Sequence, residues 1–439
     1  MSRRPLRHTP APRIAGPVGL PRLLAAPCRD HAEHLARYGP LPALHSRAER
    51  AGLIAEVEAS GLRGRGGGAF PTGRKLRAVA DGGRSPVVVA NCAEGEPASH
   101  KDSVLVRRAP HLVIDGAVVA ASAVGAETIH FVVDRADGQA RAALAHAIAE
   151  RGAEMARPDA WRIVEVPSRY VAGEESALVN FLNGNEARPV TVPPRPYERG
   201  VRGKPTLVQN VETLADVALI ARYGAAWFGA MGTKDQPGSV LATVVGAVGR
   251  PGVYEFEGGA TFTDVLAAAG GSLADLGAIL VGGYFGTWLD PADAAKLSLA
   301  QGVLQRAGAT LGCGVVAALP SECCGVAETA RVARYLASES AGQCGPCVHG
   351  LDAVAGALEA LTAGHATAGT LADLDRWLGD IEGRGACHLP DAAVGFVRSA
   401  RRVFAADFQQ HEQRRVCAHA RRPGVLPLPD PATREWSFR

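Results

Sequence analysis

The chain has 439 residues, and its 47 Lys and Arg against 44 Asp and Glu leave a formal net charge of +3. Neither this near-neutral balance nor the 5% of aromatic residues favours binding of nucleic acid by charge or by base stacking. The 47% of hydrophobic residues can form true cores, and the length corresponds to roughly two to four domains.

Membrane insertion is also excluded by the pattern of the sequence. The longest apolar run, residues 112–126, is too short for a span and is interrupted by Asp115. The N-terminus begins basic but lacks the continuous apolar segment of a signal peptide. We therefore expect a soluble, cytoplasmic protein without direct membrane insertion, in which nine cysteines, an odd number, do not form a disulfide framework.

The first half of the chain predicts an α/β domain. After a Pro- and Arg-rich arm, a helical stretch at 47–60 leads into a glycine-rich loop. Apolar β-like runs then alternate with helical patterns, which favours a mainly parallel sheet with ligands bound at its strand ends. The predicted strands are 85–91, 128–134 and 161–166, the predicted helices include 111–125 and 209–224, and 190–204 is expected to be a long loop.

The second half predicts a small α+β module followed by a helical region. From Gly238 the runs VLATVVGAV, VYEF and AILVGG read as short strands around one helix, TFTDVLAAAG. From Val326 onward, four segments with helical apolar spacing indicate a four-helix bundle. The expected organisation is an extended arm at 1–46, an α/β domain at 47–236, the small module at 237–322, the bundle at 323–412 and a loosely held tail at 413–439.

The glycine-rich loop, GLRGRGGGAFPTGRK, contains Gly64-x-Gly66-x-x-Ala69, a formal match to a dinucleotide-binding fingerprint. We reject the ordinary Rossmann interpretation because the loop follows a helix rather than a strand. Glycines still let the backbone approach a flat ring or a phosphate, and Arg65 and Lys75 add positive charge beside the loop. A mobile surface loop is the competing interpretation.

Two acidic stretches, NCAEGEPASHKD at 91–102 and YVAGEESAL at 170–178, each place two glutamates beside a glycine. Glutamates at a helix start ordinarily stabilise the helix dipole. Near a nucleotide they accept hydrogen bonds from ribose hydroxyls or ring N–H groups. Taken one by one, each stretch is better explained by the structural role.

Cys344-x-x-Cys347 and Cys387, with 39 residues between the last two, form a strong metal signal at the joints between bundle helices. Soft thiolates favour an Fe–S cluster or zinc. His388 and His349 are the nearest histidines for a fourth ligand, and a Cys3His set would suit zinc. We interpret the other cysteines as ordinary small apolar residues, with the pair Cys323-Cys324 the least clear.

Read together, GLRGRGGGAFPTGRK, NCAEGEP with KD after it, YVAGEESAL, GKPTLVQNVETLA and ESAGQCGPC…GAC stand in the order found in one family. Over about residues 47 to 410 the chain resembles the NADH-binding flavoprotein subunit of respiratory complex I and its relatives in soluble hydrogenases and formate dehydrogenases. The resemblance implies a Rossmann-like FMN-binding domain, an SLBB (β-grasp-like) module and a four-helix bundle that carries a [4Fe-4S] cluster.

The resemblance also implies a chemistry and a set of site residues. In the family, NAD(P)H gives a hydride to FMN, which releases single electrons to the Fe–S cluster and then to a ferredoxin or [2Fe-2S] protein subunit, without a catalytic side chain. The implied FMN residues are Gly64, Arg65, Gly66, Lys75, Asn91, Glu94, Gly173, Glu174, Glu175, Asn210 and Thr213. Phe70, Glu96 and Tyr170 would lie on the nicotinamide side, and Cys344, Cys347, Cys387 and a further ligand such as His388 would hold the cluster.

The chain departs from the family in both electron-transfer sites. Ala341 stands where a fourth cysteine is usual, so three cluster cysteines remain. Asp is usual at Ala93, and a family aromatic is replaced by Ala78. The Lys and Phe around the Pro-Pro pair are replaced by Val192 and Arg195, which weakens the expected NADH site.

These departures keep two alternatives open. One is a flavin and Fe–S electron carrier between two protein partners without nicotinamide. The other is a non-catalytic, zinc-stapled assembly protein. The enzyme is favoured because the glycine loop and both glutamate motifs are retained, and a scaffold has no physical need of them.

Overall fold

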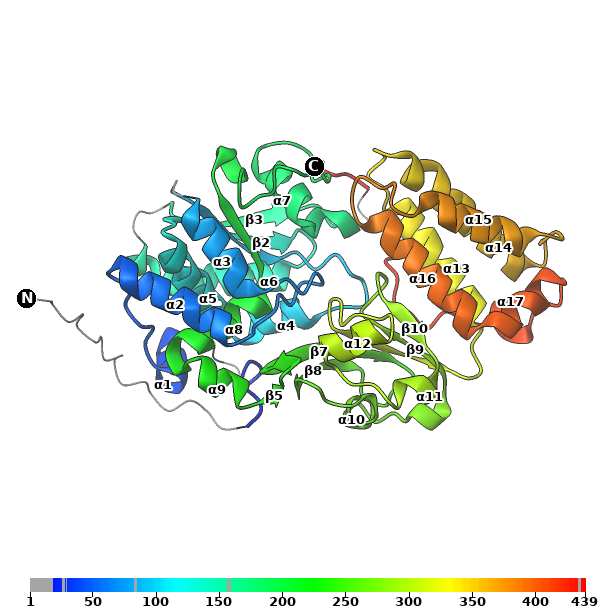
Figure 1. Ribbon diagram of the computed structural model, residues 1–439, viewed down its shortest axis with the longest axis horizontal. Coiled ribbons are helices and arrows are strands. Elements are labelled where there is room, and N and C mark those ends of the chain that lie inside the picture. The colour runs from blue at the N-terminus through cyan, green and yellow to red at the C-terminus, as the bar shows by residue number, and fades with distance from the viewer. Residues whose placement is uncertain (1–18, 26–27, 29, 83–84, 156–158, 433–435) are drawn as a thin grey trace, which may run out of the picture.

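The computed structural model describes residues 19–25, 28, 30–82, 85–155, 159–432 and 436–439. An α/β layer, a mixed sheet and a group of helices follow one another along the molecule (Figure 1). In the described part of the chain, every helix falls short of the length and hydropathy that a membrane span requires.

The α/β region is built on a four-stranded parallel sheet with the order β3-β2-β1-β4. The central strand β1 is almost entirely buried, which explains its continuous apolar run. The strands are β1 (Val87–Cys92), β2 (Thr128–Asp134), β3 (Trp161–Val166) and β4 (Thr206–Asn210). The first three were predicted. The fourth was missed, because Gln209 and Asn210 end a strand where the sequence predicted the start of a helix.

Helices cover this sheet and complete the first core. The predicted helix 111–125 is α5 (Pro110–Val124), which is buried along most of its length and packs against α8 (Val211–Tyr223). Gly116 permits the close contact, since a Cβ there would lie 2.0 Å from the carbonyl oxygen of Leu214. The other helices are α2 (Arg47–Ala59), α3 (Thr72–Asp81), α4 (Lys101–Arg108), α6 (Gly138–Glu150), α7 (Glu175–Leu182) and α9 (Ala225–Gly229).

The second region is a five-stranded mixed sheet with the order β10-β9-β11-β7-β8 and a core of its own. Its strands are β7 (Ser239–Gly246), β8 (Gly252–Glu257), β9 (Leu276–Val281), β10 (Thr287–Leu289) and β11 (Val315–Pro320). Around it lie α10 (Phe262–Ala268), α11 (Pro291–Ala294) and α12 (Gln301–Arg306), while β5 (Gly232–Thr233) and β6 (Gln236–Pro237) form a separate ribbon. The predicted α+β character is therefore confirmed.

The third region contains the four predicted bundle helices and one short addition. These are α13 (Gly325–Ser338), α14 (Asp352–Ala363), α15 (Thr370–Ile381), α16 (Leu389–Val403) and the added α17 (Ala405–Glu412). Their apolar faces share a core with one face of the second sheet. A single π-helical turn, η5 (Pro346–Leu351), leads directly into α14.

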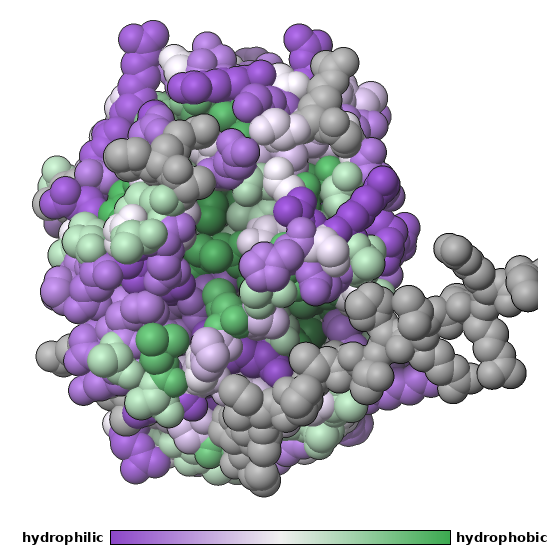
Figure 2. Space-filling view, turned by 90° about the vertical axis from the view of Figure 1, so that its left-hand side faces the viewer, coloured by the Kyte–Doolittle hydropathy of each residue, from purple (hydrophilic) through white to green (hydrophobic). Residues whose placement is uncertain are grey.

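The N-terminal arm is more ordered than the sequence predicted. Residues 31–38 form helix α1 (His31–Tyr38), whose buried His34 lies 2.5 Å from Asp115 of α5. Glu255 accepts hydrogen bonds from the backbone N–H groups of Arg22 and Leu23, which fixes the preceding segment to the second region. Figure 2 faces this end of the molecule and shows hydrophobic residues gathered at its centre with hydrophilic ones around them.

The C-terminal tail was expected to be loosely held, and the described part of it contradicts this. Buried Glu328 of α13 accepts hydrogen bonds from the backbone N–H groups of Val425 at 3.0 Å and Leu426 at 3.1 Å. Phe438 is buried, and its carbonyl oxygen accepts a hydrogen bond from the backbone N–H of Ala187 in the first region. A paired carboxylate and one aromatic anchor thus return the tail to the α/β region.

Candidate functional site

The parallel sheet itself indicates where a ligand binds. The chain passes outward from β1 through β2 to β3 and then returns to add β4 on the other side of β1. Such a reversal opens a crevice at the carboxyl ends of the two strands where it occurs. Asn91 of β1 and Asn210 of β4 are register partners at this point, and both come from the motifs identified in the sequence. The candidate site is therefore the edge above β1 and β4.

The glycine-rich loop lies against this edge. It connects α2 to α3, as the sequence predicted when the ordinary Rossmann arrangement was rejected. The backbone N–H of Arg65 donates a 2.8 Å hydrogen bond to Oγ1 of Thr213, and a Cβ at Gly66 would lie 3.1 Å from Cβ of Asn210. A Cβ at Gly68 would meet nothing within 4 Å. The loop is thus fixed on one side and open on the other.

The side chain of Arg65 does not lie where the sequence analysis expected it. Its guanidinium is buried and donates to the carbonyl oxygen of Ser239 at 3.0 Å. Its Nε lies 3.5 Å from Asp216 and 3.9 Å from Glu212, both on α8. Burial nevertheless raises the pKa of Asp216 to about 8. Because its charge serves this internal cluster, Arg65 shapes the loop through its backbone instead of adding charge beside an anionic ligand.

Lys75 supplies the positive charge at the mouth of the site. It lies on α3 and forms an ion pair with Glu175 at the start of α7, so the glycine loop and the second acidic stretch meet here. Both side chains are partly accessible. No described side chain caps the N-terminus of α3, and uncapped N–H groups at a helix start attract phosphate or other anions.

The two acidic stretches come into direct contact. Nδ2 of Asn91 donates to the carbonyl oxygen of Gly173 at 2.9 Å, and a Cβ at Gly173 would lie 2.7 Å from the carbonyl oxygen of Ala93. A Cβ at Gly95 would likewise lie 2.6 Å from the carbonyl oxygen of Tyr170. The glycines of both motifs are needed for this close approach, since the atoms in the way belong to the backbone.

Three of the expected ligand-binding side chains also cap helices. Glu94 accepts from the backbone N–H groups of Asp102 and Ser103 at the start of α4, each at 3.2 Å. Glu174 accepts from the first residues of α7, and Asn210 from Glu212 and Thr213 of α8. The structural role that each acidic stretch suggested alone is therefore present, and it fixes these side chains at the edge of the site.

Glu96 and Tyr170 form the inner wall toward the second region. The Tyr170 hydroxyl donates to Oε2 of Glu96 at 2.9 Å, and the backbone N–H of Tyr284 donates to the same oxygen at 2.7 Å. Burial raises the pKa of Glu96 to about 7. Tyr284 was not identified from the sequence, because it belongs to the second region and contributes only its backbone.

Phe70 is the aromatic group that the site presents to solvent. Its side chain is 52% exposed, and the guanidinium of Arg74 lies 5.5 Å from its ring centre. Val192 is 39% exposed, whereas Ala78 is half-buried in α3. The positions of the expected aromatic and lysine side chains thus carry no ring and no ammonium group in this chain.

The three predicted cluster cysteines also come together. Cys344 and Cys347 flank the start of η5, and Cys387 precedes α16. Burial raises the pKa of Cys347 to about 12, and the neighbouring thiols of Cys344 and Cys387 add to the effect. A π-helical turn beside them is typical of a functional position. His388 is exposed and Ala341 is buried, so the structure offers three thiols at this position and no fourth.

The flavin-side edge and the cysteine group are neighbours. Burial raises the pKa of the Cys387 thiol, and the negative charge of Glu174 raises it further. Arg188, a few residues beyond α7, donates a hydrogen bond to the carbonyl oxygen of Ala341. The second acidic stretch therefore connects the crevice above the sheet to the helical region.

The donor sets fit the two groups that the sequence implies. A glycine cradle with open space on one side, an uncapped helix start and Lys75 suit a flat ring with a phosphate. Three thiols suit an Fe–S cluster, whose several irons spread the ligands further apart than one ion does. Among the described residues, the group whose ligand atoms all lie within 4.8 Å of one another is a different one, Cys324, His411 and Cys417.

Comparison with known protein families supports the same division. Residues 57–219 match the Nuo51 FMN-binding domain, 241–278 match the SLBB domain, and 327–411 match the NADH-ubiquinone oxidoreductase-F iron-sulfur binding region. The expected SLBB module is thereby confirmed, as is the mixed α/β, α+β and helical fold.

Individual proteins resemble the chain over most of its length. An F-type NADH-quinone oxidoreductase subunit of Rhizobium meliloti, the second of two in that organism, is 33% identical over 378 residues, which cover 83% of this chain and 90% of that protein. The alpha subunit of the NAD-reducing hydrogenase HoxS of Cupriavidus necator is 37% identical over 268 residues, or 58% of this chain and 44% of that one. A crystal structure of an NAD+-reducing [NiFe]-hydrogenase matches with a TM-score of 0.76 and 33% identity, covering 90% of this chain and 68% of that one. The chain belongs to the family of F-type NADH-quinone oxidoreductase subunits.

Proposed function

We propose that this chain is the electron-input subunit of an NAD(P)H-oxidising complex, with FMN above β1 and β4 and a [4Fe-4S]-type cluster at Cys344, Cys347 and Cys387. The observation that carries the proposal is the position of Glu174. It belongs to the loop that meets Asn91 at the switch point of the sheet, and its charge also acts on Cys387. The two sites are therefore close enough to exchange electrons.

FMN, when bound, converts the two electrons of a reduced nicotinamide into single electrons that a cluster can accept. The chain holds and orients it. The open glycine backbone offers N–H groups, Lys75 and the start of α3 receive the phosphate, and Glu175 is released from its ion pair to accept a hydrogen bond. Because Glu94, Glu174 and Asn210 are fixed as helix caps, their free lone pairs already have defined directions.

The nicotinamide side is supported by Phe70, Glu96 and Tyr170. An exposed phenyl ring with a guanidinium beside it can stack on the adenine or nicotinamide ring. Glu96, with a pKa raised to about 7 by burial, carries less negative charge near neutral pH than an ordinary glutamate, which lowers its repulsion of an anionic dinucleotide. The residues at Ala78, Val192 and Arg195 favour weaker nicotinamide binding than in a chain that carries rings at these positions.

The electron acceptor is proposed to be a ferredoxin-like or [2Fe-2S] partner subunit. The relatives are themselves described as subunits of an NADH-quinone oxidoreductase and of a NAD-reducing hydrogenase. Cys344 and Cys387 are only half-buried and are flanked by exposed Gly345 and His388. A cluster held there has an edge near the surface, where a partner can approach it.

The test is the cofactor content of the full chain purified without oxygen. We expect about one FMN and about four iron atoms per chain, in keeping with one flavin site and one [4Fe-4S] cluster. A chain with three thiolate ligands is also expected to lose one iron on mild oxidation, giving about three irons per chain. A colourless protein with zinc bound to Cys344, Cys347 and Cys387 would instead support the assembly-protein alternative and contradict the proposal.

A further inference from the structure

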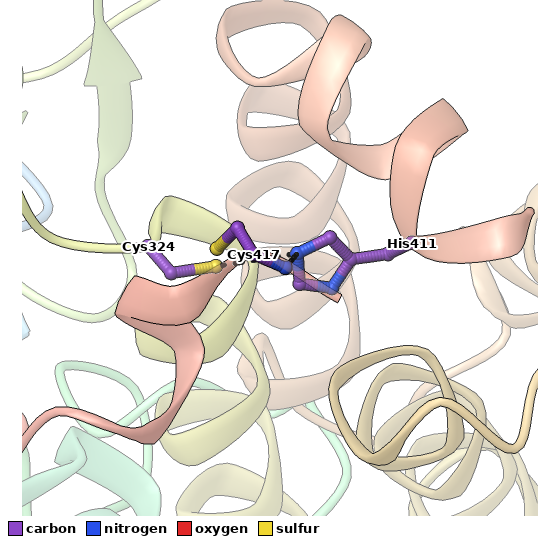
Figure 3. A group of neighbouring side chains, drawn as sticks. All are labelled: Cys324, His411 and Cys417. Atoms are coloured by element: carbon purple, nitrogen blue, oxygen red, sulfur yellow. Dashed lines mark hydrogen bonds between the residues drawn. The ribbon is translucent and has the colours of Figure 1, made fainter. Parts of the chain in front are cut away.

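A second group of soft ligands lies in the helical region, apart from the cluster cysteines. Cys324 directly precedes α13, His411 lies near the end of α17, and Cys417 follows in the segment after α17. Figure 3 shows the two sulfur atoms and the imidazole ring pointing toward one another. Cys324 lies at the opposite end of the 14-residue helix α13 from the Cys344 segment, a separation of about 20 Å along the helix axis.

The spacing of these three side chains matches one tetrahedral ion. Sγ of Cys324 and Nε2 of His411 are 3.7 Å apart, and all three ligand atoms lie within 4.8 Å of one another. Zinc bonds of about 2.3 Å to sulfur and about 2.0 Å to nitrogen at a tetrahedral angle place these atoms about 3.6 Å apart. The three side chains therefore need little movement to share an ion.

The protonation of the imidazole also suits a metal. Nε2 of His411 accepts a 3.4 Å hydrogen bond from the backbone N–H of Cys417, so its lone pair points toward the two sulfur atoms. The ring is fully buried, and this burial lowers the pKa of His411, which keeps it neutral. A neutral imidazole is the form that coordinates metals.

The sulfur of Cys324 has a defined direction as well. It caps the N-terminus of α13 and accepts a hydrogen bond from the backbone N–H of Ala327 at 3.4 Å. A helix N-terminus stabilises a thiolate. Without a metal, burial raises the pKa of the Cys324 thiol to about 12, with a further contribution from Cys417. A bound cation would remove these protons, because thiols coordinate as thiolates.

We propose that Cys324, His411 and Cys417 form a zinc site that joins the C-terminal segment to the helical region. Two thiolates and one imidazole select zinc over hard cations such as Mg²⁺ or Ca²⁺. The fourth position is left to water, since Cys324 also lines a cavity of about 470 Å³ beside the triad. This site is independent of the proposed flavin and cluster function.

The position of the site suggests what the metal does. Cys417 leads into η6 (Ala418–Arg421) and then into the tail that Glu328 binds through Val425 and Leu426. A zinc ion would fix the start of the tail to α13, upstream of those hydrogen bonds. It is thus a structural metal, and its loss is expected to release the tail without emptying the flavin site.

The direct test measures zinc in the full-length holoprotein together with iron and FMN. We expect about one zinc per chain, and zinc-edge X-ray absorption with two sulfur neighbours at about 2.3 Å and nitrogen or oxygen neighbours at about 2.0 Å. This spectrum reports only on zinc, so flavin and iron do not interfere. A protein that neither contains zinc when purified nor takes up one equivalent of Zn²⁺ overturns the proposal, as does a Cys324–Cys417 disulfide.

Matched variants separate the two sulfur-rich sites. Cys417→Ser and His411→Gln are expected to lose at least tenfold in zinc affinity while retaining iron and FMN. Cys344→Ser is expected to show the reverse, with iron lost and zinc kept. Cys323→Ser, which changes the neighbouring cysteine outside the triad, serves as the control and should keep its zinc. Zinc that survives in Cys417→Ser, or that disappears in Cys323→Ser or Cys344→Ser, contradicts the assignment.

Discussion

Glu96 provides a quantitative test of the site because its environment is closed and its partners are known. Only 8% of the residue is exposed. Its carboxylate accepts hydrogen bonds from the backbone N–H groups of Tyr284 and Ala98 and from the Tyr170 hydroxyl. Burial outweighs these hydrogen bonds and raises the pKa of Glu96 from 4.5 to about 7. Glu96→Gln resembles the protonated form in shape and hydrogen bonding, so it removes the titration with little other change.

The sign of the effect follows from the raised pKa. Between pH 4.5 and pH 7 the folded protein holds a proton on Glu96 that the unfolded chain has released, so the free energy of unfolding falls as pH rises. A shift of this size corresponds to about 3 kcal/mol. The other ionisable groups are common to both proteins. The wild type should therefore lose about 3 kcal/mol relative to Glu96→Gln between pH 4.5 and pH 8.

The assay compares the melting temperatures of the two proteins at several pH values from 5 to 8, with the same cofactor loading. For a cooperative unit of about 150–250 residues, 3 kcal/mol corresponds to a relative shift of roughly 6–12 °C. The wild type should move toward lower melting temperature with rising pH, and Glu96→Gln should not follow it. A constant difference between the two proteins over this range would show that Glu96 is ionised throughout.

Three further predictions concern other parts of the structure. Gly173→Ala places a Cβ 2.7 Å from a backbone carbonyl of the facing loop, so we expect loss of bound FMN by absorbance, whereas Gly138→Ala, with nothing within 4 Å, should keep it. Glu328→Ala leaves two backbone N–H groups of the tail without their acceptor; it should cost about 1–3 kcal/mol per group, and unchanged protection of the tail in limited proteolysis would argue against this. Cys387→Ser should remove iron and its visible absorbance but retain FMN, and a full iron content would exclude this cysteine as a ligand.

Much of the fold could be predicted because its elements have strong periodicity. The apolar runs of β1 to β3 and the four spaced apolar faces of the bundle are local signals, and each became the expected element. β4 was missed because TLVQN passes without a break into a helical sequence. The order at both ends of the chain was also missed, since His34, Glu255 and Glu328 act on residues far away in the sequence.

The site shows the same division between local and distant information. The motif order led to the family and to the loops that meet above the sheet, but the switch point itself required β4. A sequence shows the charge of Arg65 and not its direction, which is toward α8 and the second region. The triad of Cys324, His411 and Cys417 has no motif spacing at all, because 87 positions separate the first two.

The most direct test of the central proposal is anaerobic mixing of the FMN- and iron-loaded protein with NADH, followed by absorbance and by electron paramagnetic resonance. If one chain carries electrons from nicotinamide through its flavin site to Cys344, Cys347 and Cys387, the flavin absorbance should bleach and the signal of a reduced cluster should appear in the same turnover. Cys387→Ser should still bleach but give no cluster signal. A fully loaded wild-type protein that stays oxidised with both NADH and NADPH would contradict the proposal and favour a carrier between two protein partners.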